Sequence, residues 1–477
     1  METVTLSLVA HTNVGKTTLA RTLLRRDVGQ VLDQAHVTVV TEAHEVIATD
    51  GARLVLEDTP GFGDSARLKR RLGAEGNPIG WFLHQVWDRM RDKPTWCSQE
   101  AVRSVRERAD VVLYLVNASE SPEDAGYVQP EMDILAWVGR PVLLLLNQVG
   151  PGVDPAGERE REEAWRAAAA RWPLVKGVHS LDAFSRCWVE EPALFERLTA
   201  LVPEAKAPAM RALADAFAAR SLATFHAAME RLAAHVARAA TDRVPLPRRA
   251  SSAEKRKAME GLGERLEAST RGLMGDLLRL HGLDGSTAPR IEEELKDFSL
   301  QGQQVLSVRK GAIWGGLASG ALSGLAADLA TGGLSFGGGA VLGAILGALG
   351  GAGLAKGFAR VGGLGDPAVS WSEDALARLV RDAVARYLAV AHFGRGRGGF
   401  QEVDLPADWA VRIHEALVPH ANALDAAFRM GTRQGAPAEP ALRAQAAGAL
   451  LDATRRILAG LYPPAAPLLL RPAAAGV

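Results

Sequence analysis

The sequence predicts an α/β domain, with a mostly parallel sheet and flanking helices, followed by a mainly α-helical C-terminal half. Short runs rich in Val and Leu alternate with helical segments up to Pro203, which is the pattern of a buried parallel sheet. After Pro203, Ala, Leu and Arg dominate and strand-like runs are not expected. Residues 311–358 are rich in Gly and almost without charge. We therefore expect a first domain at residues 1–202 and a helical domain at residues 203–477.

The length and composition are those of a protein with two or three domains. The chain has 477 residues, with 55 basic and 55 acidic side chains. This balance carries no overall signature of a nucleic-acid binder, so nucleic acid is not an expected partner. Cys97 and Cys187 lack the spacing of a metal site or a disulfide, and the N-terminus enters a strand-like run without a secretory signal. We expect the first domain to be cytoplasmic.

The strands of the first domain are expected where apolar runs end in polar or glycine-rich turns. The first is "VTLSLVA", Val4 to Ala10, which a loop joins to a helix with leucines on one face. Further runs of this kind lie at residues 52–61, 109–120 and 140–150. Each is nearly continuous in apolar residues, as strands buried on both faces are.

The stretch "AHTNVGKTTL", residues 10–19, predicts a phosphate-binding loop of the P-loop NTPase type, because it lies between a strand and a helix. Ala10 stands where the pattern has glycine, but this position ends the strand and alanine is the smallest substitute. Lys16 would reach the β- and γ-phosphates and the Thr17 hydroxyl would bind Mg²⁺. The residues of this loop expected to bind nucleotide are Asn13, Val14, Gly15, Lys16, Thr17 and Thr18.

The motif "EDTPG" predicts the second half of the same site. Asp58 ends an apolar strand, where its carboxylate would hold Mg²⁺, and the Gly61 N–H would meet the γ-phosphate. Thr38 and Thr41 lie between the motifs, and either is suited to be the switch threonine that closes over Mg²⁺; Thr41 is favoured. The predicted metal ligands are Thr17, Thr41 and Asp58, and the predicted catalytic residues are Lys16, Thr41 and Gly61.

The second half is expected to be a helical bundle. Residues 204–240 predict one long amphipathic helix, and the two prolines of "TDRVPLPRRASS" break it before a second helix with a leucine stripe. Further helices are expected around residues 372–391, 405–428 and 438–460, before a proline-rich tail. The leucine stripe is interpreted as a core-facing surface.

Residues 311–358 predict a Gly-rich helical hairpin. Only Asp328 carries charge between Lys310 and Lys356, and ~20 apolar helical residues suffice to cross a bilayer. Glycines that recur every four residues would allow close helix packing, and the flanking basic residues would leave both ends in the cytoplasm. We expect this hairpin to lie at or in the inner membrane, with membrane lipids as partners; a glycine-rich helical pair buried in a soluble domain is the alternative.

Over residues 1 to about 200 these motifs resemble the Era-like, translation-factor-related GTPases. The stretches "HTNVGKT", "LLLLNQVG", "HSLDAFSRCWV" and "AVAHFGRGRGGF" extend the resemblance to a bacterial family that pairs such a domain with a C-terminal domain of unknown function, number 3482. The resemblance spans nearly the whole chain. It implies that the chain binds GTP and GDP with Mg²⁺, and it implies no cellular role.

The base-specificity motif departs from the class. The wider class uses Asn-Lys-x-Asp, whereas this chain has "NQVG", with Asn147 and Gln148 expected at the base and no aspartate. A lost charge-assisted hydrogen bond is worth about 1.5–3 kcal/mol, so guanine preference would fall roughly ten- to a hundredfold unless another group replaces it. Asp154 and Asp182 are interpreted as solvated loop residues. Ser180 matches the position where the class contacts the base carbonyl through its backbone.

Two residues bear on hydrolysis. Phe62 stands where related proteins place the glutamine that orients water, which predicts slow hydrolysis without an activator. Asn13 matches an asparagine that holds K⁺ in potassium-stimulated relatives, and the alternative is that it only shapes the loop.

The sequence thus predicts an enzyme, a GTPase that acts as a nucleotide-dependent switch at the inner membrane. An unidentified protein partner is expected, and a homodimer through the G domain stays open. The alternatives are a nucleotide-gated binding switch that does not hydrolyse GTP and, by fold analogy alone, a ribosome-associated assembly GTPase.

Overall fold

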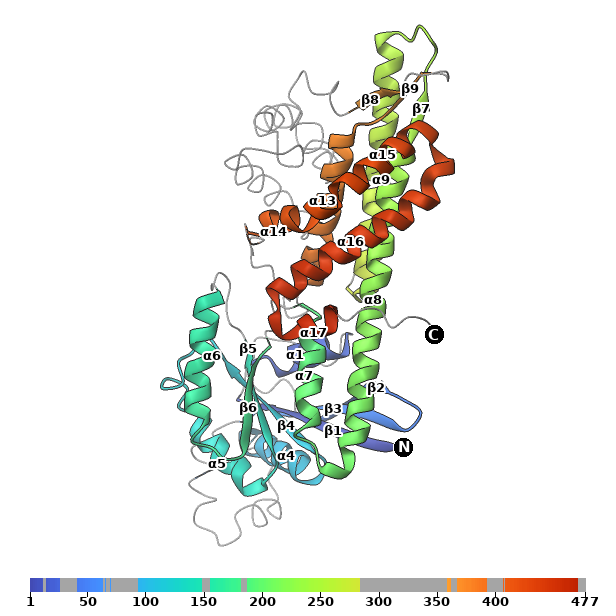
Figure 1. The fold of residues 1–477 in the computed structure, drawn as a ribbon. Helices are drawn as coiled ribbons and strands as arrows, with labels where there is room; N and C mark the ends of the chain where they lie inside the picture. Colours follow the sequence, from blue (N-terminus) through green and yellow to red (C-terminus); the bar gives the residue numbers. More distant parts are fainter. Residues whose placement is uncertain are drawn as a thin grey trace. The chain divides into compact units, whose positions relative to one another are not determined.

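The computed structural model describes residues 1–11, 14–25, 41–62, 65, 69, 93–147, 155–181, 187–283, 358–361, 367–392, 406 and 408–470. These residues form two compact units: the first contains Met1–Ser221 and also His392, and the second begins at Leu222, within the long helix α8 (Ala207–Thr241). We describe each unit by itself (Figure 1).

The first unit is built on a mostly parallel sheet, as the sequence predicts. Among the described residues its strand order is β2-β3-β1-β4-β5-β6, and every neighbouring pair is parallel except β2 and β3. The strands are β1 (Glu2–Ala10), β2 (Glu42–Ala48), β3 (Ala52–Asp58), β4 (Val111–Asn117), β5 (Val142–Asn147) and β6 (Val175–Ser180). The edge strand β2 was not expected, because its sequence "EAHEVIA" is largely polar and exposed.

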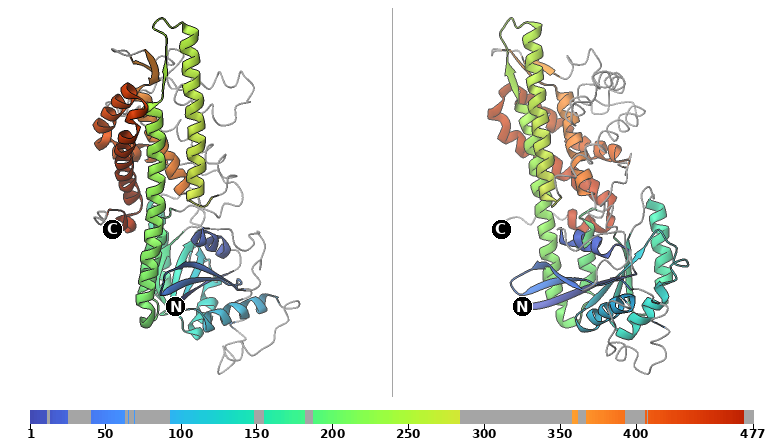
Figure 2. Two further views of the ribbon diagram at one scale, coloured as in Figure 1. Left: turned by 90° about the vertical axis from the view of Figure 1, so that its right-hand side faces the viewer. Right: turned by 180° about the vertical axis from the view of Figure 1, so that it is seen from behind.

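Helices cover both faces of this sheet (Figure 2). The core of one face contains α1 (Lys16–Leu24), α7 (Glu190–Thr199) and the start of α8. The core of the other face contains α4 (Lys93–Glu107), α5 (Val128–Val138) and α6 (Pro155–Ala169). Within β4, Leu113 points into the first core and Tyr114 into the second, so an uninterrupted apolar strand is what this position requires.

The second unit is mainly helical, and α-helices lie in the predicted helical stretches other than the Gly-rich hairpin. After the 3₁₀ turn η1 (Glu204–Lys206), α8 and α9 (Ser252–Leu280) run antiparallel: His235 contacts Ser269, and Arg265 contacts Asp242. The later helices are α13 (Glu373–Ala391), α14 (Asp408–Leu417), α15 (Ala421–Gln434), α16 (Glu439–Leu461) and α17 (Ala466–Leu469). The stretch expected as one helix at 405–428 is two helices, separated by the 3₁₀ turn η3 (Val418–His420), whose proline lacks a backbone N–H.

A small antiparallel sheet corrects the expectation that strands end at Pro203. It consists of β7 (Arg243–Pro245), β9 (Ala368–Trp371) and β8 (Phe358–Val361), in that order. Strands of three or four residues are too short for a two-residue hydrophobic period to be recognised in the sequence. Phe358, the last residue of the expected hairpin, begins β8, and the rest of the hairpin, residues 311–357, lies outside the described residues.

No helix in the described part of the chain combines the length and the apolar character needed to cross a bilayer.

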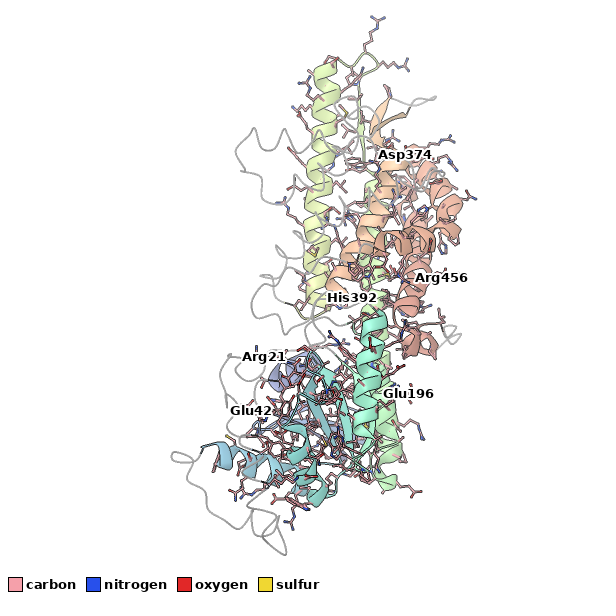
Figure 3. The ribbon with its side chains drawn as sticks, turned by 90° about the vertical axis from the view of Figure 1, so that its left-hand side faces the viewer. Arg21, Glu42, Glu196, Asp374, His392 and Arg456 are labelled. Atoms are coloured by element: carbon pink, nitrogen blue, oxygen red, sulfur yellow. The ribbon has the colours of Figure 1, made fainter. Side chains whose placement is uncertain are left out.

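Charged side chains lie on the outside of both units (Figure 3). Glu42 and Glu196 are exposed in the first unit, and Asp374 and Arg456 are exposed in the second. Buried charged side chains are therefore the ones that indicate a possible site, because burial of an ionised side chain is unfavourable unless the side chain is paired.

Candidate phosphate-binding site

The phosphate loop joins β1 to α1. Gly15 lies directly before α1 with φ 94°, a left-handed conformation that favours glycine. Ala10 is still part of β1 and is fully buried, so the departure from glycine at this position falls on an ordinary strand conformation. The start of α1 has no side-chain cap and no acidic residue in its first turn. Backbone N–H groups at the start of a helix have no acceptor within the helix, which makes this position suited to an anion.

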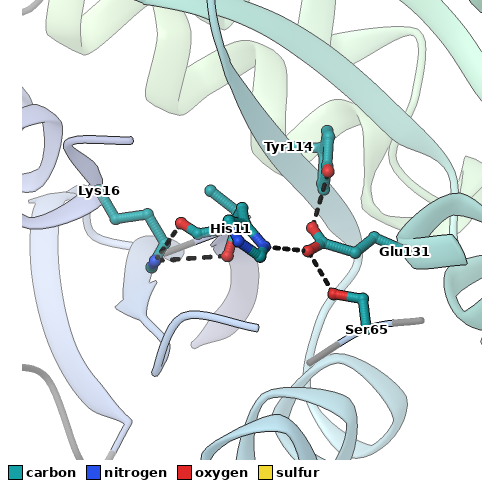
Figure 4. A network of polar contacts seen from close by, with 6 residues as sticks. His11, Lys16, Ser65, Tyr114 and Glu131 are labelled. Atoms are coloured by element: carbon teal, nitrogen blue, oxygen red, sulfur yellow. Dashed lines mark hydrogen bonds and ion pairs between the residues drawn. The ribbon is translucent and has the colours of Figure 1, made fainter. Parts of the chain in front are cut away.

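Lys16 is the first residue of α1 and is only 7% exposed. Its ammonium group lies 3.5 Å from the carbonyl oxygens of Ala10 and of His11, both in the loop (Figure 4). Burial lowers the pKa of Lys16, while the charges of Asp58 and Glu131 act in the opposite direction. A phosphate placed here would add negative charge next to the ammonium group and favour its protonated form.

Thr17 and Asp58 bring the two predicted motifs together. The Thr17 hydroxyl donates a 2.6 Å hydrogen bond to Asp58 Oδ2, although the residues are 41 positions apart. The cause is the parallel pairing of β1 with β3, which places the ends of both strands at one edge of the sheet. Burial raises the pKa of Asp58, and the Thr17 hydrogen bond and the charge of Lys16 oppose this.

The oxygen atoms at this position fit Mg²⁺, the ion that the sequence motifs predict. Mg²⁺ takes oxygen ligands, and hydroxyl and carboxylate oxygens meet here. Asp58 Oδ1 is buried and has no hydrogen-bond partner within the described part of the chain. The residues that would hold the ion are therefore Thr17 and Asp58.

Thr41 reaches the same edge of the sheet through β2. Glu42 lies opposite Asp58 in the antiparallel pair, so the residue before Glu42 comes to the carboxyl end of β3. The Thr41 hydroxyl is buried and, among the residues that the structure describes, has no hydrogen-bond partner. Thr38, the alternative switch threonine, lies outside the described residues, as does Asn13. Gly61 is buried beside the loop, where Phe62 N–H donates to Ala10 O at 3.0 Å.

At the expected base position, Asn147 ends β5 and is fully buried. Its side-chain N–H donates to the carbonyl oxygen of Val14 at 2.7 Å, so it holds the phosphate loop directly. Ser180 ends β6, and its hydroxyl donates to Glu162 at 3.0 Å. Gln148 lies outside the described residues, as do Asp154 and Asp182.

A buried network beside the loop was not expected from the sequence (Figure 4). Glu131, on α5, accepts hydrogen bonds from His11, Ser65 and Tyr114. The available signal was the position of Glu131 between Val128 and Leu135, on the face of α5 that is otherwise apolar and buried. His11 gave a second signal, as a polar residue inside a loop that otherwise needs small side chains.

Two family models match the chain. Residues 5–148 match the model described as 50S ribosome-binding GTPase, and residues 166–454 match the model described as domain of unknown function (DUF3482). No curated protein matches the chain.

Solved structures match the chain in part. A crystal structure of Aquifex aeolicus Era bound to GDP and aluminium fluoride is 20% identical and covers 43% of this chain and 58% of that chain, with a TM-score of 0.32. Era in complex with MgGDPNP and part of 16S ribosomal RNA is 18% identical, with the same coverage and a TM-score of 0.33. The GMPPNP-bound NFeoB of S. thermophilus is 15% identical and covers 46% and 76%, with a TM-score of 0.22. The chain therefore spans little more than half the length of the Era chains that it matches.

Proposed function

Because the chain belongs to the DUF3482 family and carries a GTP-binding P-loop GTPase domain similar to Era before that region, we propose that it hydrolyses GTP to GDP and phosphate and acts as a nucleotide-dependent switch. The observation that carries the proposal is the hydrogen bond of Thr17 to Asp58. It joins the two motifs that would hold Mg²⁺ and the phosphates, directly beside the buried Lys16.

The proposed roles follow from the positions of these groups. The Lys16 ammonium group turns from the loop carbonyls to the β- and γ-phosphates, and the N–H groups in the first turn of α1 bind phosphate oxygens. The Gly61 N–H meets the γ-phosphate, and water is the nucleophile. Thr17, Asp58 and the switch residue Thr41 would hold Mg²⁺, which would supply positive charge to offset the charge developing on the phosphates.

Hydrolysis is proposed to be slow without an activator. Phe62, at the position of the water-orienting glutamine, is fully buried and offers no polar side-chain group to a water molecule. K⁺ bound through Asn13 is a further part of the proposal, because a monovalent cation beside the phosphates would stabilise the transition state electrostatically. Equal rates of GTP hydrolysis in K⁺ and in Na⁺ would contradict the role of K⁺ and leave the rest of the proposal unchanged.

Guanine selectivity is proposed to rest on Asn147 together with Gln148 and the backbone at Ser180. The hydrogen bond of Asn147 to Val14 supports a role in joining the base side of the site to the phosphate loop. Because the chain lacks the aspartate of the usual motif, we expect a modest preference for guanine.

The deciding experiment is an equilibrium titration of the purified, nucleotide-free protein with GDP, ADP and XDP in Mg²⁺ and K⁺. We expect GDP to bind more tightly than ADP, and the Lys16→Ala variant to bind GDP about 10- to 100-fold more weakly, because charge-assisted hydrogen bonds to phosphate are lost. The matched control is Lys176→Ala, which removes an exposed lysine from β6 and should bind as the unchanged protein does.

Equal affinity for the three nucleotides, or a preference for ADP, would contradict guanine selectivity. A single-turnover assay with GTP then separates an enzyme from the alternative, a switch that binds GTP without hydrolysing it. No phosphate release over hours would favour that alternative.

Ribosome association is a second candidate, because the model that matches residues 5–148 is described as a 50S ribosome-binding GTPase. One of the matched Era structures also contains ribosomal RNA, so the expectation that nucleic acid is not a partner has no support from the matches. Co-sedimentation with ribosomal subunits that persists at high salt would favour this candidate, since non-specific binding is lost there.

Association with the inner membrane is proposed from the sequence of residues 311–358 alone. Its support is the nearly charge-free, glycine-rich run with basic flanks. Flotation of the full chain with phosphatidylglycerol vesicles, compared with a variant that lacks residues 311–357, tests it. Equal behaviour of the two chains would exclude this segment as the membrane contact.

A further inference from the structure

We propose that Glu131 is a positioning residue that couples the phosphate loop to the segment after Gly61, so that the preference for GTP over GDP depends on it. The post-Gly61 segment is represented by Phe62, Ser65 and Lys69 among the described residues. The inference rests on the proposed function, because it concerns how the same site recognises the γ-phosphate.

The geometry places one carboxylate oxygen between two parts of the site. Glu131 Oε1 accepts a 2.7 Å hydrogen bond from His11 Nδ1, in the phosphate loop, and a 2.6 Å hydrogen bond from the Ser65 hydroxyl. The other oxygen, Oε2, accepts a 2.7 Å hydrogen bond from the Tyr114 hydroxyl on β4. Tyr114 therefore fixes the carboxylate to the sheet, while Oε1 is shared by His11 and Ser65 (Figure 4).

Burial makes these contacts energetically important. Glu131 is fully buried, and an ionised carboxylate in such a position is unfavourable unless donors surround it. Its three donors come from separate regions of the chain: Ser65 is 66 residues away and His11 is 120 residues away. Loss of either contact would leave part of the carboxylate unsatisfied, so the two contacts depend on each other.

His11 is held by contacts with three further residues, one of which is Lys16 of the phosphate loop. Its ring stacks on Tyr127 with 4.6 Å between centroids, its carbonyl oxygen lies 3.5 Å from the Lys16 ammonium group, and its backbone pairs with Phe62. A change in the position of the His11 ring therefore acts on the part of the loop that holds Lys16.

The post-Gly61 segment has a second contact with α5, the ion pair of Lys69 with Asp133. This pair is partly exposed and is expected to contribute little energy. Of these two contacts between described residues, the buried one of Ser65 is then the stronger link between this segment and α5. Ser65 follows Gly61 by four residues. A displacement of Gly61 to or from the γ-phosphate is therefore expected to change the hydrogen bond from Ser65 to Glu131 Oε1.

The test compares the affinities of GDP and of the non-hydrolysable β,γ-imido analogue of GTP in Mg²⁺. The measured quantity is the ratio of the GDP dissociation constant to the analogue dissociation constant. We expect Ser65→Ala and Glu131→Gln each to lower this ratio about fivefold or more, the range of a coupling between two sites. The double variant should lower it no further than Glu131→Gln alone, because both changes remove the same link.

The matched control is Asp110→Asn, at the opposite end of the sheet. Asp110 is buried, and its Oδ2 also accepts two hydrogen bonds, from Thr5 N–H and from Lys206. This variant removes the same kind of charge and is expected to lower the melting temperature without changing the ratio. The control therefore shows whether a loss of stability by itself changes the ratio of the two dissociation constants.

The outcomes are separable from those of the proposed function. If Ser65→Ala and Glu131→Gln bind both nucleotides with an unchanged ratio, the role of Glu131 is overturned while GTP binding stands. If both changes lower the ratio but their effects add fully in the double variant, the shared-oxygen link is overturned. If the unchanged protein binds neither nucleotide, the proposed function and this inference fail together.

Discussion

Gly15 and Ala10 meet different geometric demands of the phosphate loop. Gly15 takes the left-handed conformation, with φ 94°, that side chains with a Cβ atom adopt only at a cost. Ala10 keeps an extended conformation, and its carbonyl oxygen accepts the Phe62 N–H. Of the two glycine positions in the pattern, only the second one requires glycine for a conformational reason in this chain.

Lys16 and Asp58 are both held in conditions that oppose their charge. Burial lowers the pKa of Lys16 and raises that of Asp58, and each partly offsets the effect on the other. Binding of a phosphate together with a cation would favour the charged forms of both side chains. The phosphate would place negative charge beside Lys16, and the cation would place positive charge beside Asp58.

His235, in the second unit, predicts that stability depends on pH. It is buried against Ser269, and burial lowers its pKa from 6.5 to about 4. The folded state therefore binds the proton less readily than the unfolded state, so stability is complete above pH 6.5 and is lost as the pH falls towards 4. Between pH 7 and pH 5 we expect a loss of about 2 kcal/mol in the unfolding free energy of this unit, measured by urea titration.

The His235→Gln variant should be less stable at pH 7 but should lack this part of the pH dependence. His420→Gln, which changes a histidine that contacts Asp452, should retain it because His235 is intact. An identical pH slope in the unchanged protein and in His235→Gln would contradict the assignment.

Helix α1 is attached to its neighbours at its C-terminal end. Arg25 follows the helix with φ 53°. Its guanidinium donates hydrogen bonds to Glu191, in the first turn of α7, and to Ser221 on α8. The same guanidinium lies over the Phe217 ring. These contacts compensate for a left-handed conformation that costs a residue other than glycine about 1–2 kcal/mol.

The start of α9 offers a test of helix capping. Ser251 and Glu254 form a reciprocal capping box: the Ser251 hydroxyl accepts from the Glu254 N–H, and the Glu254 carboxylate accepts from the Ser251 N–H. We expect Ser251→Ala to lower the unfolding free energy of the second unit by about 1 kcal/mol, because the cap is lost. Ser252→Ala, at the next and exposed position, is the control and should change the free energy by less than about 0.5 kcal/mol in urea titrations. Equal effects of the two changes would contradict the capping role.

The division into two compact units predicts that the chain does not unfold in one step. The phosphate loop belongs to the first unit, and a ligand stabilises the part of the protein that must be folded to bind it. In calorimetry we expect two transitions, and GDP with Mg²⁺ at about 100 times its dissociation constant should raise the first unit's midpoint by roughly 5–10 °C. The second unit's midpoint should stay where it is.

Lys16→Ala at the same GDP concentration is the control, and its midpoints should move by much less. A single transition that shifts as a whole would show that α8 couples the units into one cooperative structure, which would contradict this prediction.

The sequence by itself determined those features that depend on neighbouring residues. The phosphate loop, the apolar strands of the sheet and the long helices of the second unit follow from local patterns, because a turn, a strand or a helix is specified by residues next to it in the chain. The "GKT" and "DTPG" motifs also predicted that Thr17 and Asp58 belong to one site, and the parallel pairing of β1 with β3 brings the two side chains together.

Only the tertiary structure decided which distant groups share a site. His11, Ser65 and Glu131 meet because β1 and β4 are adjacent and α5 packs on the face that contains Tyr114, and no local pattern encodes that arrangement. The same holds for the small sheet, in which β7 pairs with β9 although the two strands are more than a hundred residues apart in the chain. A buried carboxylate such as Glu131 therefore indicates where distant parts of the chain meet. Its burial is unfavourable unless hydrogen-bond donors surround it, and only the tertiary fold brings those donors to it.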